Sequence, residues 1–491
     1  MADEQKMPIP AKVDDVNEFM KERVGVGVSF DVGHRTLIIL KKKVEIYYTT
    51  GLADAEVVQR VLSKLMSIND DERNTNKVSE IIENRLVHMQ VKRTESIDDC
   101  VDQFLSGLIV VFMDGCDFAF VVDTRSYPGR QPEEPDTEKV IRGPRDGYTE
   151  NIIINTALTR RRIRDERLRL EMMQVGERSK TDICIAYIED VADPNLVKLI
   201  KKELKEIEID GLPMSDKSVE EYLVKQGNRP FPLVRYTERP DIGAVHLFEG
   251  HVLIIVDTSP SVIITPATYF SHLQHAEEYR ESPAPGTFIR WVRLTGIFVS
   301  LFLLPFWYLI TVHPELLPQS IDFIGPNKDD GHIPLFLQIL LADLGIEFLR
   351  LAAIHTPTPL STAMGLIAAV LIGEIAINVG LFTPEVILYV AISAVGSFVT
   401  PSFELSVSNK ITRIFFLVAT AIFGVPGFVI SITLAILILV GTKSLNTPYM
   451  WPFIPFNLKA LLEIAYRTPV PLTKYRPSIT NSPDKTRAPN S

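Results

Sequence analysis

Three carboxylates stand inside mostly apolar stretches of the C-terminal half, where a charge needs a partner, water or a function. Glu374 and Asn378 are four residues apart, so a helix would place both on one face. Asp343 and Glu347 have the same spacing, and a helix would let Glu347 pair with Arg350. In a symmetric oligomer each acid becomes a ring, which is how cation pores commonly select ions. Glu374, Asn378, Asp343 and Glu347 are therefore the candidate ion-path residues. For Glu374 a buried hydrogen bond that fixes helix packing is the alternative. For the helix of Asp343 and Glu347 the alternatives are a place at the membrane interface and docking on the soluble part of the chain.

Other residues of this half could pair helices or let them move. Gly373 and Gly365 are small enough to predict close helix contact. The segments Pro357–Pro359 and Thr400–Glu404 break helices near membrane depth, which is tolerable only beside protein or water. The candidates for helix pairing or gating are Arg350, Gly373, Pro401 and Glu404.

Nothing in the sequence predicts an enzyme. It has no GxSxG, Walker, HExxH or kinase motif, and Gly25-Val-Gly27 lacks a third glycine at nucleotide-binding spacing. The nine histidines and three cysteines show no metal-ligand spacing, so we expect neither a metal nor another cofactor. The arginines at 160, 161, 162 and 164 favour a solvated helix end or a subunit contact over nucleic acid, because the net charge is −10.

The distribution of charge divides the chain into an aqueous part and a membrane part. Lys and Arg number 51 and Asp and Glu number 61, yet only 15 of these residues fall in Trp291–Pro455. Leu294–Pro314, Leu351–Gly373, Val386–Phe403 and Ile414–Thr442 are uncharged and mostly apolar. About 20 such residues let a helix cross a bilayer. The sequence predicts an all-α polytopic membrane domain after a charged aqueous part.

Flanking charges predict the topology. The N-terminus has no apolar core and is no signal peptide, so the aqueous part is expected in the cytosol. Arg290 and Arg293 before the first span and the Lys- and Arg-rich tail agree with this orientation. Both ends lie inside if Ile333–Ile354 crosses and if Ile411–Val440 is a hairpin broken at Gly424–Gly427. Five or six segments are expected.

The aqueous part has the pattern of α/β or α+β subdomains. Val24–Leu40 and Lys41–Thr50 predict a strand pair, and Asp54 is a plausible N-cap for a helix with an apolar stripe up to Ile68. An Asp-Gly pair within Met113–Asp117 predicts a hairpin. Ser126–Tyr148, rich in proline and charge, has the composition of a linker.

Two segments carry a resemblance to a known family. Glu133–Glu150, EEPDTEKVIRGPRDGYTE, with Asn155–Arg162 after it, resembles the linker signature of the A subunits of GerA-type spore germinant receptors. Ile372–Ala376, Thr383-Pro384 and Ser397–Pro401 resemble the membrane core of that family, and the tail motif YRTPVP is similar to the stage V sporulation AF branch. The residues that match the linker motif are Glu134, Pro135, Arg142, Gly143, Pro144 and Arg145.

The resemblance implies a spore inner-membrane protein that assembles as a homo-oligomeric, pentameric ring and conducts monovalent cations during germination. It also implies other spore membrane germination proteins as partners. The alternatives are a non-conducting membrane scaffold and a nutrient germinant receptor A subunit. The expected organisation is a flexible N-terminus (1–23), a first α/β cytosolic subdomain (24–125), the linker (126–148), a second α/β cytosolic subdomain (149–285), the membrane domain (286–455) and a basic cytosolic tail (456–491).

Overall fold

The computed structural model describes most of the chain and divides it into two compact units, Met1–Arg130 and Gln131–Ser491. The described residues are 6–24, 26, 32–49, 52–68, 78–86, 91–126, 134–135, 138–163, 165, 167–227, 229–316, 324, 332–355, 365 and 371–487.

The first unit is built on a five-stranded antiparallel sheet in the order β1-β2-β4-β5-β3. Its strands are β1 (Val32–Ile39), β2 (Lys42–Thr49), β3 (Val91–Thr94), β4 (Ile109–Met113) and β5 (Ala119–Val122). The predicted strand pair is β1 and β2, with Val32 opposite Thr49. The predicted Asp-Gly hairpin joins β4 to β5 and sets Val111 opposite Phe120.

Helices cover both faces of this sheet, which explains why its central strands are continuously apolar. The helices are α1 (Val13–Val24), α2 (Ala55–Met66), α3 (Val78–Arg85) and α4 (Ile97–Leu105). Val111 packs with α2 and α3, whereas Val110 and Phe112, its neighbours on β4, pack with α1 and α4. Asp54 caps α2 as predicted, because its side chain accepts from the amides of Glu56 and Val57.

The N-terminal segment differs from the expected flexible region of residues 1–23. Residues 13–24 form helix α1, and its Val13, Val16 and Met20 are buried against the sheet. The charged residues between them hid this short apolar stripe in the sequence.

The second unit begins by repeating the topology of the first. Its elements are α5 (Ile152–Arg162), β6 (Leu168–Val175), β7 (Thr181–Ile188), α6 (Pro194–Lys205), α7 (Ser215–Val224), β8 (Arg235–Thr237), α8 (Pro240–Phe248), β9 (Val252–Val256) and β10 (Val262–Thr265). The sheet order β6-β7-β9-β10-β8 matches the first sheet strand for strand. Asp193 caps α6 as Asp54 caps α2, and Gly107 and Gly250 before the central strands share a φ of 94°. No repeat in the sequence predicts this duplication.

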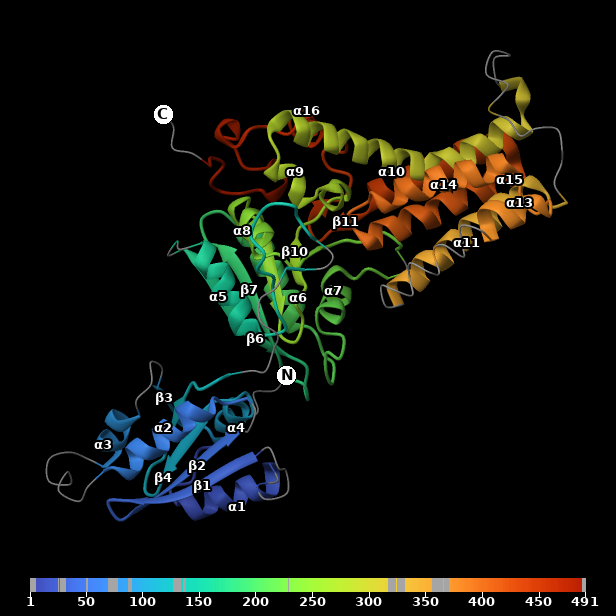
Figure 1. The fold of residues 1–491 in the computed structure, drawn as a ribbon. Helices are drawn as coiled ribbons and strands as arrows, with labels where there is room; N and C mark the ends of the chain where they lie inside the picture. Colours follow the sequence, from blue (N-terminus) through green and yellow to red (C-terminus); the bar gives the residue numbers. More distant parts are fainter. Residues whose placement is uncertain are drawn as a thin grey trace. The chain divides into compact units, whose positions relative to one another are not determined.

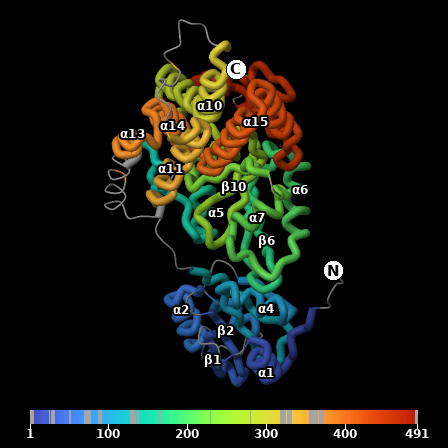
Figure 2. The backbone as a smooth tube through the Cα atoms, turned by 90° about the vertical axis from the view of Figure 1, so that its right-hand side faces the viewer, coloured from blue at the N-terminus to red at the C-terminus, as the bar shows by residue number. Residues whose placement is uncertain are grey.

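A helical part follows in the same unit. Its helices are α9 (Ala276–Arg280), α10 (Pro283–Val312), α11 (Leu335–His355), α13 (Ala376–Asn378), α14 (Pro384–Phe398), α15 (Phe403–Gly441) and α16 (Leu458–Ala465), with a small ladder of β11 (Lys443–Ser444) and β12 (Thr447–Pro448). Short turns of 3-10 helix occupy Tyr269–Leu273, Pro314–Leu316, Val470–Leu472 and Ser478–Thr480, and a π-helical turn occupies Leu371–Ile375. Helices α10, α11, α14 and α15 lie together as a bundle (Figures 1 and 2).

Helix α15 reverses direction at Gly424, where φ is 60° and ψ is −137°. A straight helix of 39 residues would be roughly 58 Å long. Instead both ends contact one short segment: Ser408 donates to the carbonyl of Pro230, and Ser444, just past the helix, donates to that of Leu233. A side chain at Gly427 would collide with the carbonyl of Ala419 across the bend. These contacts agree with the predicted hairpin broken at Gly424–Gly427.

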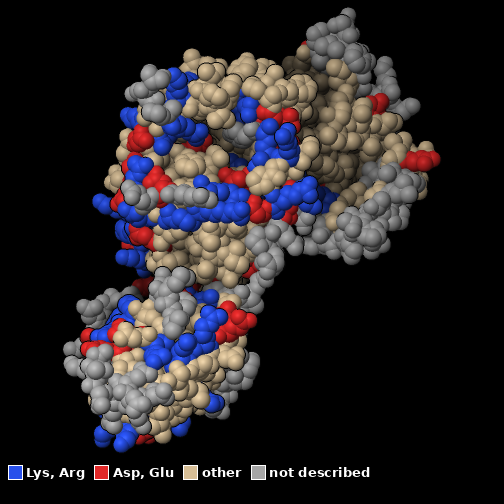
Figure 3. Space-filling model, turned by 60° about the vertical axis from the view of Figure 1, so that its left-hand side comes forward, with Lys and Arg blue, Asp and Glu red and all other residues tan. Residues whose placement is uncertain are grey.

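Two of the described helices, α10 and α15, are long and apolar enough to cross a membrane by length and composition. Helix α14 is apolar but shorter. Helix α11 carries Asp343, Glu347 and Arg350. On the face shown in Figure 3, charged side chains gather over the α/β parts, while the helical part is largely uncharged.

The expected boundaries at 285 and 455 do not separate compact bodies. One hydrophobic core joins Ile185 and Ile254 of the second sheet to Ile297 of α10 and Leu405 of α15. The tail also folds back onto the α/β part, because Thr480 donates to the carbonyl of Glu249 at 2.8 Å. The second α/β part, the helices and the tail therefore form one unit.

Candidate functional site

The predicted face of α11 meets two cations from the first arm of α15. Asp343, Glu347 and Arg350 lie at intervals of four and three residues, so they share one side of the helix. Lys410 and Arg413 project toward it from α15. We call the five side chains the charged network.

Arg413 is the centre of the charged network. Its Nη2 lies 2.6 Å from Oδ1 of Asp343. Its Nη1 donates to the carbonyl of Ser300 at 2.8 Å and to Oγ of Ser393 at 2.5 Å. The Arg413 side chain is only 2% exposed. One guanidinium thus ties α10, α11, α14 and α15 together.

Lys410 and Arg350 complete the network toward its edge. Nζ of Lys410 lies 2.8 Å from Oε2 of Glu347 and donates to the carbonyl of Asp343 at 2.9 Å. Arg350 donates to Oγ of Ser406 at 3.0 Å and is 3.8 Å from Glu347, so the predicted pair within the helix is the longer of its contacts. The rings of Phe398 and Phe403 lie 5.5 and 4.6 Å from the Arg350 guanidinium carbon.

The network pairs opposite charges in a place where an isolated charge would be costly. Two carboxylates face three cations, and removing one partner of a buried pair typically costs about 3–5 kcal/mol. Sequence reasoning treated Lys410 and Arg413 only as flanking charges before an apolar block. Their three-residue spacing on α15, beside the four-residue spacing of Asp343 and Glu347, was the signal for a helix-to-helix network.

Glu374 and Asn378 lie elsewhere, outside the charged network. Glu374 belongs to the π-helical turn Leu371–Ile375 and Asn378 ends α13, and both are exposed. The structure therefore places two of the four predicted ion-path residues in the charged network and two at the surface of the chain.

The glycines near Glu374 make no close helix contact within the described part of the chain. Gly373 is exposed, and an added Cβ at Gly373 or Gly365 would meet no described atom within 4 Å. Pro357–Pro359 lies outside the described residues. The predicted close packing at these glycines is thus not made inside the described chain.

Pro401 and Glu404 lie at the junction between α14 and α15. The helices are separated at Thr400–Ser402, and the Ser402 side chain caps α15 by accepting from the amide of Leu405. Glu404 lies 3.2 Å from Nζ of Lys217 on α7. Glu404 therefore links a bundle helix to the α/β part.

The Lys217 contact continues into the second α/β core. Lys217 is 2.6 Å from the buried Glu220, which accepts from the Tyr236 hydroxyl at 2.5 Å. Burial raises the pKa of Glu220, and the Lys217 hydrogen bond opposes that shift. A second link lies nearby, where the Tyr269 hydroxyl donates to Asn409, next to Lys410, at 3.2 Å. The α/β part and the charged network are thus joined by polar contacts.

The described residues of the linker motif are ordered against the second α/β part. Glu134 accepts from the amide of Val140, and the buried Arg239 donates to the carbonyl of Pro144 at 2.9 Å. Arg145 and Arg239 each lie 3.9 Å from Glu134. In the same segment Pro135 is buried, Gly143 lies against Arg280, and Arg142 is exposed. The composition predicted a linker, but these residues form part of the second unit.

Within the described ranges no group of three or more His, Cys, Asp or Glu side chains could hold a metal ion.

Comparison with known proteins then decides the family. A family model described as "Bacillus/Clostridium GerA spore germination protein" matches residues 18–479. The chain belongs to the GerA family. The predicted family is confirmed.

Several GerA relatives resemble this chain over most of its length. Stage V sporulation protein AF of Bacillus subtilis (strain 168) is 58% identical over 480 residues, which cover 98% of this chain and 97% of that protein. Spore germination protein KA of the same organism is 30% identical over 99% of this chain and 90% of that protein. Spore germination protein A1, also from B. subtilis, is 30% identical over 89% of each chain.

Among solved structures, the chain is similar to the N-terminal domain of the A subunit of the Bacillus megaterium spore germinant receptor GerK3. It is 28% identical and covers 54% of this chain and 98% of that domain, with a TM-score of 0.23.

Proposed function

We propose that this GerA-family protein is a multi-pass protein of the spore inner membrane. In this proposal it forms a homo-oligomeric, pentameric ring and conducts monovalent cations during germination. The observation that carries the proposal is the near-complete GerA match together with an acid, Glu374, exposed in the sparsely charged helical half. An exposed acid in such surroundings favours contact with water, an ion or a neighbouring subunit.

The two sets of candidate residues have different roles in this proposal. Glu374 and Asn378 contact the ion, since both are exposed at the surface of the chain. Asp343 and Glu347 shape the path indirectly, because Arg413 and Lys410 neutralise them and hold the helices in place. Gly373, exposed beside Glu374, lets a neighbouring subunit approach closely.

The membrane topology of the proposal rests on the two long apolar helices and the tail. The tail contacts the second α/β part through Thr480 and through the ion pair between Arg487 and Glu249, so both lie on the same side of any membrane. Arg290 and Arg293 at the start of α10 favour the cytosol for that side. The hairpin of α15 brings its two ends back to this side.

Potassium flux into proteoliposomes tests the proposal. The full-length protein should conduct, and Glu374→Gln, which keeps the shape and removes the charge, should lower the flux at least several-fold. Glu206→Gln, at the exposed C-cap of α6, is the matched control and should conduct normally. If the protein inserts and assembles but gives no potassium flux, the channel is rejected in favour of a non-conducting membrane scaffold.

A nutrient germinant receptor A subunit is the second candidate, favoured by the 30% identity to spore germination proteins KA and A1. Other spore membrane germination proteins would then be obligatory partners. Co-purification from spores distinguishes the two, since a self-sufficient channel assembles without them.

A further inference from the structure

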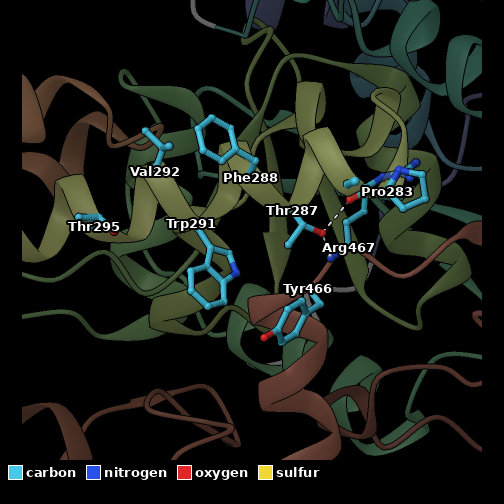
Figure 4. Close-up of a pocket in the computed structure, with 9 residues that line it drawn as sticks. Pro283, Thr287, Phe288, Trp291, Val292, Thr295, Tyr466 and Arg467 are labelled. Carbon is cyan, nitrogen blue, oxygen red and sulfur yellow. Dashed lines mark hydrogen bonds between the residues drawn. The ribbon is translucent and has the colours of Figure 1, made fainter.

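A groove of about 790 Å³ lies where the first turns of α10 meet the end of α16. Figure 4 shows Trp291 projecting from α10 toward Tyr466, and their ring centroids are 5.8 Å apart. Phe288, which also lines the groove, is 69% exposed. Large exposed apolar surface of this kind marks an interaction site.

The surface continues from the groove along α16 and the segment after it. Leu458, Leu462 and Tyr466 recur every four residues and are exposed, while Ala460 is buried on the opposite side. Val470, beyond the helix, is 74% exposed. We call Phe288, Trp291, Leu458, Leu462, Tyr466 and Val470 the juxtamembrane apolar surface.

Helix α16 is fixed rigidly to α10, so its depth follows from that helix. Arg290 donates to the carbonyls of Glu463 at 2.7 Å and Ile464 at 3.2 Å. Nε1 of Trp291 donates to the carbonyl of Ala465 at 2.8 Å. These bonds satisfy carbonyls that a helix end otherwise leaves without partners.

The position of Trp291 sets this depth at the edge of the hydrocarbon. The uncharged run of α10 begins at Leu294, about 4.5 Å farther along the helix axis than Trp291. Trp and Tyr concentrate at this level of a bilayer, where the ring is apolar and its polar group reaches a partner. Trp291 and Tyr466 therefore lie at the headgroup level if α10 spans the membrane.

The charges around the apolar surface suit a bilayer with anionic lipids. Lys459 and Lys474 are exposed, and Nζ of Lys459 lies 4.2 Å from the ring centroid of Tyr475. Glu463 is the one acid of α16. Basic residues next to an amphipathic helix attract anionic headgroups.

We infer that α16 and the groove form an interfacial anchor that takes up phospholipid acyl chains from the leaflet facing the α/β parts. The anchor rests on the membrane placement of α10 in the proposed function, but not on ion conduction. A bilayer is favoured over a second copy of the chain because the exposed apolar surface continues along α10 at Phe298 and Phe306. The lysines at its edge point to the same occupant.

Quenching by spin-labelled lipids tests the anchor in the full-length protein. Leu462→Cys is labelled with an environment-sensitive dye in a Cys116→Ser background, since Cys100 and Cys184 are buried. The protein is reconstituted in nanodiscs of phosphatidylcholine and phosphatidylglycerol with a spin label near the headgroup. We expect at least two-fold stronger quenching than at Lys485→Cys in the exposed polar tail.

A dye at Ile430→Cys, exposed on the second arm of α15, separates failure of the anchor from failure of membrane placement. Quenching at Ile430 by lipids that carry the spin label deep in the acyl chain, without quenching at Leu462, would overturn the anchor and leave the membrane placement intact. No quenching at either position would overturn both. Disulfide cross-linking of Leu462→Cys between copies, without lipid quenching, would assign the surface to a second copy and reject the anchor.

Discussion

The first unit and the start of the second have one topology but different surroundings. In the first, helices of the unit cover both faces of the sheet, and the core closes within Met1–Arg130. In the second, the core extends from the sheet into α10 and α15 through Ile297 and Leu405. The same arrangement of strands thus serves once as a self-contained unit and once as the platform for a helix bundle.

The difference lies in a few segments between the repeated elements. Phe231 and Leu233, before β8, and Tyr269, after β10, pack with Tyr449 beyond the α15 hairpin. Lys217 adds an ion pair to Glu404 on α15. Within the second unit, these contacts join the α/β part to the bundle.

The largest effect is expected from breaking the charged network, and it should be confined to the second unit. Asp343→Ala leaves Arg413 buried without its carboxylate and should cost about 3–5 kcal/mol in the free energy of unfolding of the second unit. Glu374 is an exposed acid in the same half of the chain, so Glu374→Gln should change the free energy of unfolding little. Hydrogen exchange followed by mass spectrometry reports each unit separately.

The control for this prediction is the first unit of the same protein, whose exchange should not change. A double variant, Asp343→Asn with Arg413→Gln, should be less destabilised than the sum of its single variants, because the two side chains are in contact. Faster exchange throughout Met1–Arg130 in Asp343→Ala would contradict the independence of the two units.

A matched pair of core truncations sharpens the comparison. Leu65 in α2 and Leu204 in α6 occupy equivalent positions, and both are buried. Leu65→Ala and Leu204→Ala should each cost about 2–4 kcal/mol. Leu204→Ala should also speed exchange at the bases of α10 and α15, because its core includes Ile297 and Leu405, whereas Leu65→Ala should not. Equal effects of the two variants on the bundle would show that the core does not transmit the change.

A smaller change in stability is expected when the pH is lowered, and it should affect mainly the second unit. Burial lowers the pKa of His251 to about 4 and that of His272 to about 3, and nearby Arg235 adds to both shifts. The unfolded state binds more protons than the folded state between these values and about 6.5, so stability is lost as pH falls through this window. Between pH 7 and pH 5, His251 alone should lower the free energy of unfolding by about 2 kcal/mol.

Exchange at pH 7 and pH 5, corrected for the intrinsic dependence of exchange on pH, measures this difference. His251→Gln should reduce the acid sensitivity of the second unit. In the first unit His34 instead lies 2.5 Å from Glu45, so the two repeats differ in how they place histidine. Equal acid sensitivity in the two units would argue against the buried histidines as the cause.

Local elements followed from the sequence because their causes are local. The strand pair β1 and β2, the Asp-Gly hairpin and the Asp54 cap depend on residues within a few positions of one another. The reversal at Gly424 was equally readable, because glycine and proline interrupt an apolar run there. The linker motif was specific enough to predict the family, which the comparison confirmed.

The tertiary structure alone decided where the charges meet. Sequence spacing put Asp343 and Glu347 on one helix face, but their partners Lys410 and Arg413 lie more than 60 residues away and looked like flanking charges. The duplicated topology was hidden because the same fold tolerates many apolar sequences. The free energy of a buried charge depends on what surrounds it in space, and that depends on packing between distant segments. Types and spacing of residues were thus determined by the sequence, while pairing and exposure were decided by the fold.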